Sequence, residues 1–358
     1  MIVGALSLRD FRSYSKLDVG LEPGLVLVTG PNGAGKTNLL ESLHVGTQGF
    51  SPRTRVDAQL VRFGHEAARI GLRGDRAGVP LDLEVKLELG TGKRATVNGA
   101  RLRAAEQLRA EVTTLVFTPD RLVVVKGGPA ARRAYFDRAL GRFAPSRAGL
   151  SAEYGAAVGQ RNAALRRVAH GVSTREALEP WNEAVSRLGG DLVAGRHETV
   201  EALQPQFAER AGELGLADAR LRYDGEPPTR EQLASRVDRD LERGTTGLGP
   251  HLDDVGVLSG GRDLRAFGSQ GEQRLAVLGL LLAEADLLAD RRGTRPLLLL
   301  DDVLSELDSG RRQILADRLR AGGQTLVTSA SRNALPGEPA QTLEVAQSDE
   351  GTSSVQAA

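Results

Sequence analysis

Eight consecutive residues of this chain have the types and spacing of a phosphate-binding loop. Residues 30–37 read GPNGAGKT and match the pattern G-x-x-x-x-G-K-[ST]. In such a loop the glycines let backbone N–H groups point at a phosphate, the lysine reaches the β- and γ-phosphates, and the final hydroxyl binds magnesium. Only five of the 47 basic residues are lysines, so composition alone does not explain a lysine here. The sequence therefore predicts a site for ATP and Mg²⁺ formed by Gly30, Pro31, Asn32, Gly33, Ala34, Gly35, Lys36 and Thr37.

A pair of carboxylates follows an apolar run nearer the other end of the sequence. Residues 296–303 read PLLLLDDV, which is typical of a buried strand that ends in two acids. A phosphate-binding loop needs a carboxylate to hold its metal ion, so we expect Asp301 to bind Mg²⁺ together with Thr37, directly or through water. Asp302 is predicted to act as the general base or to position the attacking water. The alternative is an acidic strand end without catalysis, which the phosphate-binding loop disfavours.

A third candidate segment lies between these two. Residues 267–274 read FGSQGEQR and precede an apolar stretch over 275–288 that predicts a helix. Serine and glycine at a helix start can form an anion-binding surface, although Ser269 could equally be a simple helix cap. The sequence SELD at 305–308, just after the acidic pair, favours the anion-binding interpretation.

The segments around these residues predict a mixed α/β protein. An apolar run over 25–29 precedes the loop and an amphipathic stretch over 37–45 follows it, as expected for strand, loop and helix. Alternating leucines and valine over 81–89, a turn and a return over 94–97 predict an antiparallel section. Further strands are predicted by the following segments: 254–258, 297–300, 325–328 and 342–345.

Helical periodicity replaces this pattern from about residue 130 to about residue 243. We expect Pro180, the pair Gly189–Gly190 and Pro205 to interrupt it, which predicts a compact helical lobe or a short antiparallel arm. The polar residues from 347 onwards are predicted to be disordered. The predicted divisions are 1–130 and 246–346 for the two parts of an ATPase head, 131–245 for the inserted helical lobe and 347–358 for the tail.

Charge and composition narrow the classes of function. The chain has no cysteine, which excludes disulfides and thiolate metal sites, and no apolar run long enough to cross a bilayer. No export signal is visible at the start, so we expect a cytoplasmic protein without a membrane partner. Residues 121–170 hold ten basic and two acidic side chains, a net charge of +8 in a chain whose total is +1. That segment could meet a polyanion such as DNA, or it could be a solvated set of helix faces.

Taken in order, the loop, SQGEQ at 269–273, LLLLDDV and SELD resemble an ABC-type ATPase head of the SMC-like branch. Three more segments resemble the RecF family of bacterial recombination mediators: FRSYSKLDV at 11–19, PDRLVVVKGGPAARRAYFD at 119–137 and GPHLDDV at 249–255. The resemblance implies that Arg12 approaches the nucleotide phosphates. It also implies that Ser269 and Gly271 contact the γ-phosphate of ATP bound to a second subunit.

The same resemblance implies a function. It predicts an ATP-dependent homodimer that grips double-stranded, single-stranded or gapped DNA and releases it on slow, DNA-stimulated ATP hydrolysis. Partners would be the mediator proteins RecO and RecR, and the task would be loading RecA during recombinational DNA repair, replication restart and the SOS response. The DNA contacts predicted from the basic segment are Arg132, Arg133, Arg161, Arg166 and Arg167.

The sequence departs from the wider pattern in two places. No glutamine occurs in LVFTP at 115–119, where a Q-loop is expected, and Gln48 follows the phosphate-binding loop too soon to serve. Hydroxyl residues at 328, 329 and 331 stand where a switch histidine is usual, so γ-phosphate sensing would fall to a hydroxyl. His251 in the GPH motif is expected to hold a turn.

Three other classes of protein share some of these motifs. An ABC-type subunit that drives a membrane transporter stays the main alternative, although the missing histidine and the place of the helical lobe argue against it. A structural SMC tether would need hundreds of heptad residues, against an interrupted insertion of about 110. A guanine-specific switch protein would need an Asn-Lys-x-Asp motif, which the sequence lacks.

Overall fold

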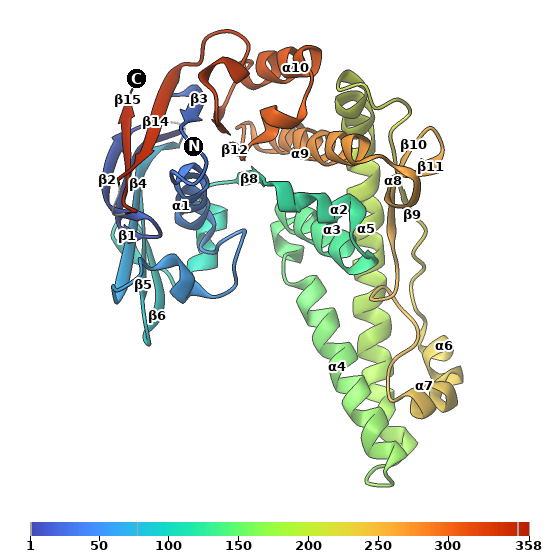
Figure 1. Ribbon diagram of the computed structural model, residues 1–358. Helices are drawn as coiled ribbons and strands as arrows, with labels where there is room; N and C mark the ends of the chain where they lie inside the picture. The colour runs from blue at the N-terminus through green and yellow to red at the C-terminus, as the bar shows by residue number, and fades with distance from the viewer. Residues whose placement is uncertain (1, 77, 349–350, 358) are drawn as a thin grey trace. The chain divides into compact units, whose positions relative to one another are not determined.

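In the computed structural model, which describes residues 2–76, 78–348 and 351–357, the chain forms two compact units (Figure 1). The first, here called the P-loop unit, comprises residues 1–121 and 288–358. The second, the helical unit, comprises residues 122–287 and contains both the predicted lobe and the SQGEQ segment. No helix in the described part of the chain is long and apolar enough to cross a membrane.

One sheet of the P-loop unit is antiparallel, with the strand order β2-β1-β4-β5-β6-β7. Its strands are β1 (Ile2–Phe11), β2 (Tyr14–Gly20), β4 (Ala67–Arg76), β5 (Val79–Glu88), β6 (Gly92–Val97) and β7 (Ala100–Arg101). The hairpin predicted over 81–97 is the β5–β6 pair, so this section of the prediction is confirmed.

The other sheet of this unit has the order β15-β14-β3-β13-β12-β8 and is parallel except for β15, which runs antiparallel to β14. Its strands are β3 (Gly24–Thr29), β8 (Thr114–Phe117), β12 (Leu297–Leu300), β13 (Gln324–Ser329), β14 (Gln341–Gln347) and β15 (Ser353–Ala357). The buried parallel strand predicted to carry the acidic pair is β12, with the expected bounds. Helix α10 (Ser309–Arg320) lies between β12 and β13 in the sequence.

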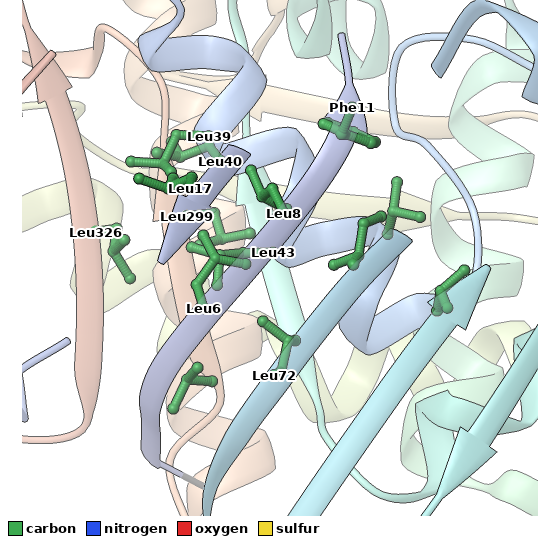
Figure 2. Packing of buried hydrophobic residues seen from close by; sticks show 14 of the residues in the cluster. Leu6, Leu8, Phe11, Leu17, Leu39, Leu40, Leu43, Leu72, Leu299 and Leu326 are labelled. Atoms are coloured by element: carbon green, nitrogen blue, oxygen red, sulfur yellow. The ribbon is translucent and has the colours of Figure 1, made fainter. Parts of the chain in front are cut away.

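Helix α1 (Lys36–Gln48) supplies the core that joins the two sheets. Leu39 and Leu43 of α1 are buried among leucines of β1 and of the parallel strands β12 and β13, as Figure 2 shows. Burying a leucine contributes about 1.5–3 kcal/mol of hydrophobic free energy, so this cluster fixes the helix firmly between the sheets. The start of α1, where the phosphate-binding loop ends, is fixed with it.

The prediction of a disordered tail is wrong for the described residues 351–357. Ser353–Ala357 form β15, which pairs with β14 from Leu343↔Ala357 to Gln347↔Ser353. The polar composition misled the prediction because an edge strand needs few apolar side chains when its backbone hydrogen bonds are made to a neighbour. In this strand Ser353 is the residue that is buried.

The helical unit contains α2 (Val123–Lys126), α3 (Pro129–Phe143), α4 (Leu150–Ala169), α5 (Glu179–Glu213), α6 (Arg230–Ser235), α7 (Val237–Arg243), α8 (Leu264–Phe267) and α9 (Gln270–Arg292) as far as Leu287. It also holds a small antiparallel sheet of β9 (Arg220–Tyr223), β10 (Val255–Ser259) and β11 (Arg262–Asp263). Helices α4 and α5 lie side by side and share a core around Leu150, Tyr154, Val185 and Leu188 (Figure 1).

The interruptions predicted at Gly189–Gly190 and at Pro205 are wrong, because α5 runs unbroken through these residues. A Cβ on Gly189 would lie 2.7 Å from Cγ of Pro228, so this glycine permits close packing. Pro205 is exposed, as is Glu201 four residues earlier, so water can satisfy the carbonyl that the proline leaves without a partner. Pro180 behaves as expected at the first turn of α5.

Candidate nucleotide site

The phosphate-binding loop connects β3 to α1 and depends on glycine at particular positions. Gly30, Gly33 and Gly35 have φ angles of 146°, 83° and 114°, in the region that side chains disfavour. A Cβ on Gly30 would lie 2.1 Å from the carbonyl oxygen of Val345 on β14, so no larger residue fits there. The loop conformation is therefore set both by its glycines and by the strand beside it.

Lys36 stands at the first residue of α1 with its ammonium group folded over the loop. Its Nζ donates hydrogen bonds to the carbonyl oxygens of Gly30 at 2.7 Å and Pro31 at 2.8 Å. Burial lowers the pKa of Lys36, while the negative charges of Asp302 and Asp301 oppose that shift. The lysine therefore lies close enough to both predicted acidic residues to be affected by their charges.

Asp301 directly follows β12 and lies beside the start of α1. Its carboxylate accepts hydrogen bonds from the Thr37 hydroxyl at 2.9 and 3.0 Å and from the Thr328 hydroxyl at 2.8 Å. Thr328 comes from the neighbouring strand β13, where the parallel register places it next to the end of β12. Burial raises the pKa of Asp301, an effect that the two threonine hydroxyls partly offset. Thr37 and Asp301 thus place hard oxygen donors close together, and this donor set fits Mg²⁺.

Asp302, the predicted base, is exposed and has a left-handed φ of 52°. Its backbone N–H donates to the Thr328 hydroxyl at 2.8 Å, so Thr328 fixes both acidic residues at once. A non-glycine residue in this region of φ costs of order 1 kcal/mol and persists only where its surroundings require it. The two adjacent aspartates therefore differ in exposure, because Asp302 is exposed while Asp301 is buried.

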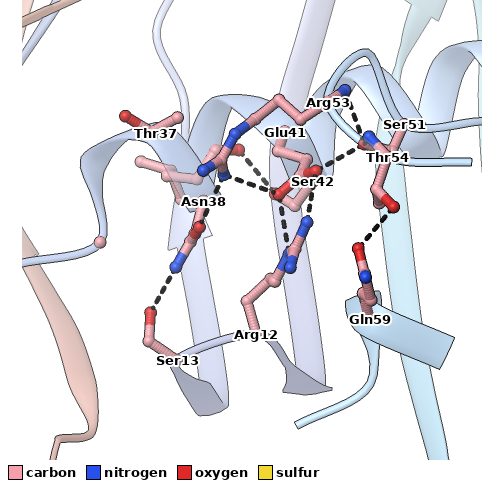
Figure 3. A network of polar contacts seen from close by, with 12 residues as sticks. Arg12, Ser13, Thr37, Asn38, Glu41, Ser42, Ser51, Arg53, Thr54 and Gln59 are labelled. Atoms are coloured by element: carbon pink, nitrogen blue, oxygen red, sulfur yellow. Dashed lines mark hydrogen bonds and ion pairs between the residues drawn. The ribbon is translucent and has the colours of Figure 1, made fainter. Parts of the chain in front are cut away.

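Arg12 lies in the β1–β2 turn, where it too has a left-handed φ of 53°. Its guanidinium makes a bidentate pair with Glu41 of α1, with Nε and Nη2 each 2.9 Å from a carboxylate oxygen. Arg53 donates to the same carboxylate at 3.2 Å, and the Ser51 hydroxyl also bonds to it (Figure 3). Because the Glu41 side chain is completely buried, the two arginines form the solvent-facing part of this cluster.

Arg53 was not predicted from the sequence. Its charge lowers the pKa of Asp301, and its Nη1 lies 3.2 Å from Oδ1 of Asn38 on α1, which places it at the nucleotide site. No local sequence pattern distinguishes Arg53 from the other arginines of this arginine-rich chain. Its contact with Glu41 could therefore not be predicted from the sequence. A cavity of about 580 Å³ opens here, lined in part by Arg12, Ser13, Asn38, Arg53, Phe63 and His65.

Ser269 and Gly271 lie at the start of α9 in the helical unit, and both are exposed. Ser269 caps the helix reciprocally with Glu272. The serine N–H donates to the glutamate at 2.8 Å, and the serine hydroxyl accepts from the Glu272 N–H at 3.2 Å. These hydrogen bonds lower the pKa of Glu272. The helix start is therefore well ordered and open to solvent, and Phe267 beside it is 70% exposed.

The arginines predicted to contact DNA fall into two groups. Arg166 and Arg167 are exposed at the end of α4, and Arg133 is half-buried, with its guanidinium on the Asp253 carbonyl. Arg132 and Arg161 are buried and paired with Asp254 and Asp240, which removes them from the candidate contacts. Burial of a charged side chain requires such pairing, and sequence spacing does not reveal it.

His251 satisfies the expectation that it holds a turn. Its Nδ1 lies 2.8 Å from the Tyr154 hydroxyl, and its Nε2 lies 3.0 Å from the carbonyl oxygen of Thr246. Since a carbonyl can only accept, Nε2 carries the proton, and Nδ1 accepts from the tyrosine. Burial lowers the pKa of His251, consistent with a neutral ring that joins α4 to the GPH segment.

Comparison with known proteins supports what the geometry indicates. The family model described as RecF/RecN/SMC N terminal domain matches residues 2–354. The chain belongs to this family. It is 37% identical to the DNA replication and repair protein RecF of Streptomyces avermitilis and 35% identical to that of Heliobacterium modesticaldum. Each comparison covers 94% of this chain and 95% of the relative.

Solved structures of family members show the same fold. The recombination mediator protein RecF-ATP of the RecFOR pathway is 26% identical, with a TM-score of 0.87, and the match covers 99% of this chain and 97% of the other. An Smc head bound to the C-winged helix domain of ScpA has a TM-score of 0.63 at 16% identity over 100% and 98% of the chains, which shows the fold alone. The chain therefore has the RecF/SMC-head ABC-type ATPase fold, as its motifs predicted.

Proposed function

We propose that this protein is an ATP-dependent DNA-binding ATPase of recombinational repair and replication restart. The observation that carries the proposal is the joint placement of Lys36, Thr37, Asp301 and Asp302 at one end of the parallel sheet. The RecF names of the relatives and the RecF-ATP neighbour support the same function.

ATP would be bound with its β- and γ-phosphates on the amides of the phosphate-binding loop and on Lys36. Arg12 and Arg53 add positive charge beside the loop, and Glu41 fixes the orientation of both. Thr37 and Asp301 would hold Mg²⁺, which supplies charge to the phosphate oxygens during hydrolysis. Asp302 is exposed at the same edge and would orient the attacking water or accept its proton.

The active form would be a homodimer. Ser269 and Gly271 would contact the γ-phosphate of ATP on a second copy of the chain, because an ordered, exposed helix start is a suitable anion site. Exposure of Phe267 next to this helix start supports a contact surface there. ATP would then join two heads, and weak, DNA-stimulated hydrolysis would separate them.

DNA would be held by exposed arginines, among which Arg166 and Arg167 are retained from the sequence prediction and Arg133 is half-buried. Such phosphate contacts bind single-stranded, double-stranded or gapped DNA with little dependence on sequence. RecO and RecR are the proposed protein partners because the solved RecF neighbours belong to the RecFOR pathway. The proposed outcome is the loading of RecA on DNA, with the protein acting in the cytoplasm.

The decisive experiment compares Asp302→Asn with Lys36→Ala. Asp302→Asn should bind ATP and accumulate as a DNA-bound dimer, since it keeps the phosphate and metal ligands and loses only the water-positioning acid. Lys36→Ala should fail to bind ATP and stay monomeric. Light scattering in the presence of ATP, ADP and DNA measures dimer and complex formation by each variant. Hydrolysis by Asp302→Asn at the wild-type rate would remove Asp302 from the mechanism.

Ser269→Arg tests the shared site separately. This variant should bind ATP through its own loop yet remain monomeric, because a bulky cation replaces the helix-start contact to phosphate. When it is mixed with Lys36→Ala, one complete site of the two can form, so ATP-dependent pairing should return in part. A Ser269→Arg protein that hydrolyses ATP at the wild-type rate as a monomer would contradict the shared site.

A further inference from the structure

The strand formed by residues 353–357 reaches the phosphate-binding loop through one buried side chain. Ser353, which is 1% exposed, has its hydroxyl 2.6 Å from the carbonyl oxygen of Ala34 and 2.8 Å from the hydroxyl of Ser13. Its backbone N–H donates to the Ser13 carbonyl oxygen at 2.9 Å. Three parts of the P-loop unit that are distant in sequence therefore meet at Ser353.

The direction of these hydrogen bonds follows from counting protons. A carbonyl oxygen only accepts, so the single hydroxyl proton of Ser353 is donated to Ala34, and Ser353 accepts from the Ser13 hydroxyl. Ser13 in turn accepts from the side-chain amide of Asn38 at 2.9 Å. Arg53 donates to the other end of that amide at 3.2 Å, which fixes its orientation. A single chain of donors thus runs from Arg53 through Asn38, Ser13 and Ser353 to the backbone of the loop.

Bonds to these loop carbonyls determine where the loop amides point. In a trans peptide the C=O and N–H groups are directed to opposite sides. Ser353 holds the Ala34 carbonyl, and the Tyr14 hydroxyl donates to the Gly35 carbonyl at 3.0 Å, so the next two N–H groups are directed away from Ser353 and Tyr14. Those N–H groups belong to Gly35 and Lys36, which are the amides expected to bind phosphate.

The packing at this contact leaves no room for a side chain on Gly35. A Cβ on Gly35 would lie 2.4 Å from the Ser353 hydroxyl oxygen and 3.1 Å from that of Ser13. The phosphate-binding loop pattern requires glycine at position 35 because the backbone there must approach a phosphate closely. The contact with Ser353 is a second reason why no larger residue fits at this position. The preceding residue, Thr352, is also bonded to a distant part of the P-loop unit, because its hydroxyl accepts a hydrogen bond from the Arg62 guanidinium at 2.8 Å.

We propose that β15 is a working part of the nucleotide site, with Ser353 as a positioning residue for the Gly35 and Lys36 amides. The proposal rests on the proposed binding of ATP. Because β15 favours the loop conformation that binds phosphate, bound ATP must stabilise β15 in return by the same factor. Docking of residues 351–357 and nucleotide binding are therefore coupled.

The test compares Ser353→Ala with Ser354→Ala in the full chain. Ser354 is the next residue of the same strand and is exposed, so its variant controls for the loss of a serine hydroxyl from β15. Titration with MgATP should give an affinity about fivefold weaker for Ser353→Ala and unchanged for Ser354→Ala, since one neutral hydrogen bond is lost. Ser13→Ala should weaken binding similarly. The double variant Ser13→Ala/Ser353→Ala should lose less than the sum, because both residues belong to one chain of donors.

Hydrogen exchange on the wild-type protein gives a second measurement that needs no variant. Addition of MgATP should slow exchange of the β15 amides as well as those of the phosphate-binding loop. Unchanged exchange in β15, or equal ATP affinity of Ser353→Ala and wild type, would overturn the coupling. A wild-type protein that binds no ATP would instead refute the proposed function, so the two failures are distinguishable.

Discussion

Two arginine–carboxylate clusters, one in each unit, are buried in opposite ways. In the P-loop unit the carboxylate of Glu41 is fully buried, while the side chains of Arg12 and Arg53 are 21% and 38% exposed. In the helical unit Arg161 and Arg132 are themselves buried, with side-chain exposures of 0% and 2%. The first arrangement leaves the guanidinium groups open to solvent, where a ligand could reach them, and the second uses them to join segments inside the unit.

This contrast shows what decides the role of a basic residue in an arginine-rich chain. A guanidinium has five donors in a fixed plane. Arg161 donates hydrogen bonds to Asn182, Asp240, Thr246 and the Leu233 carbonyl oxygen, so its guanidinium is not accessible to a phosphate. Arg12 bonds to Glu41 through Nε and Nη2 and borders the cavity at the start of α1. The exposure of an arginine and the partners of its donors therefore distinguish a candidate binding residue from a structural one.

The largest expected effect tests the structural cluster. Arg161→Ala leaves Asp240 buried without its cation, and removal of one partner of a buried pair costs about 3–5 kcal/mol. Urea denaturation should show this loss in the free energy of unfolding. Arg166→Ala, on an exposed position of the same helix, should change stability by less than about 0.5 kcal/mol. Equal stability of the two variants would mean that Arg161 is not a structural residue.

A smaller loss is expected from the nucleotide-site cluster. Glu41→Gln removes the charge that orients Arg12 and Arg53 but keeps a side chain of similar shape. Loss of one charge-assisted partner costs about 1.5–3 kcal/mol, so ATP affinity should fall by about tenfold or more. Isothermal titration with MgATP measures the affinity. The Glu209→Gln variant, at an exposed acid that pairs with Arg210 in the helical unit, should bind ATP as wild type does.

How far the sequence predicts this molecule differs between the same two regions. The loop over 30–37, the strand 297–300 and the acidic pair were all foreseen, because each is a local pattern with a fixed structural context. Arg53 and Ser353 were missed, since they reach the site by tertiary contacts across 12 and 319 residues. No spacing rule encodes such contacts.

The helical region was predicted correctly as helical, but not in its details. Proline and glycine were expected to break α5, yet tertiary packing at Gly189 and solvent exposure at Pro205 allow the helix to continue. Tertiary packing also explains why two of the predicted DNA contacts are wrong. A net charge of +8 over 121–170 does not show which arginines are buried. Only the partners of Arg132 and Arg161 reveal that these two are internal.

Arg166 and Arg167 at the end of α4 are the exposed arginines predicted to contact DNA. The double variant Arg166→Gln/Arg167→Gln removes two exposed guanidinium groups and should reduce the salt slope of DNA binding by about 2 (about 0.9 per phosphate contact). Fluorescence anisotropy at several salt concentrations measures the slope. Arg187→Gln, also exposed in the helical unit, is the matched control and should leave the slope unchanged if its face does not meet DNA. An unaltered slope in the double variant would assign Arg166 and Arg167 to a solvated face.

The smallest effect concerns a buried acid that has hydroxyl partners in place of an arginine. Burial raises the pKa of Asp301, so the folded protein binds this proton more tightly than the unfolded chain does. The free energy of unfolding must then fall as pH rises from the ordinary aspartate pKa through the raised one. Binding of MgATP should change in the opposite direction, being lost as pH falls through the raised pKa, because the metal needs the ionised carboxylate.

Asp301→Asn separates these two trends. Without a titrating group at this position, the variant should lack the corresponding fall in stability with rising pH, as followed by urea denaturation without nucleotide. Glu338→Gln, at an exposed position of the same unit, controls for removal of one negative charge and should retain the wild-type pH profile. The MgATP affinity of Asp301→Asn should be low at every pH, whereas that of Glu338→Gln should follow the wild type. If Asp301→Asn and wild type have parallel stability profiles across the acidic range, the raised pKa of Asp301 is not a property of the folded protein.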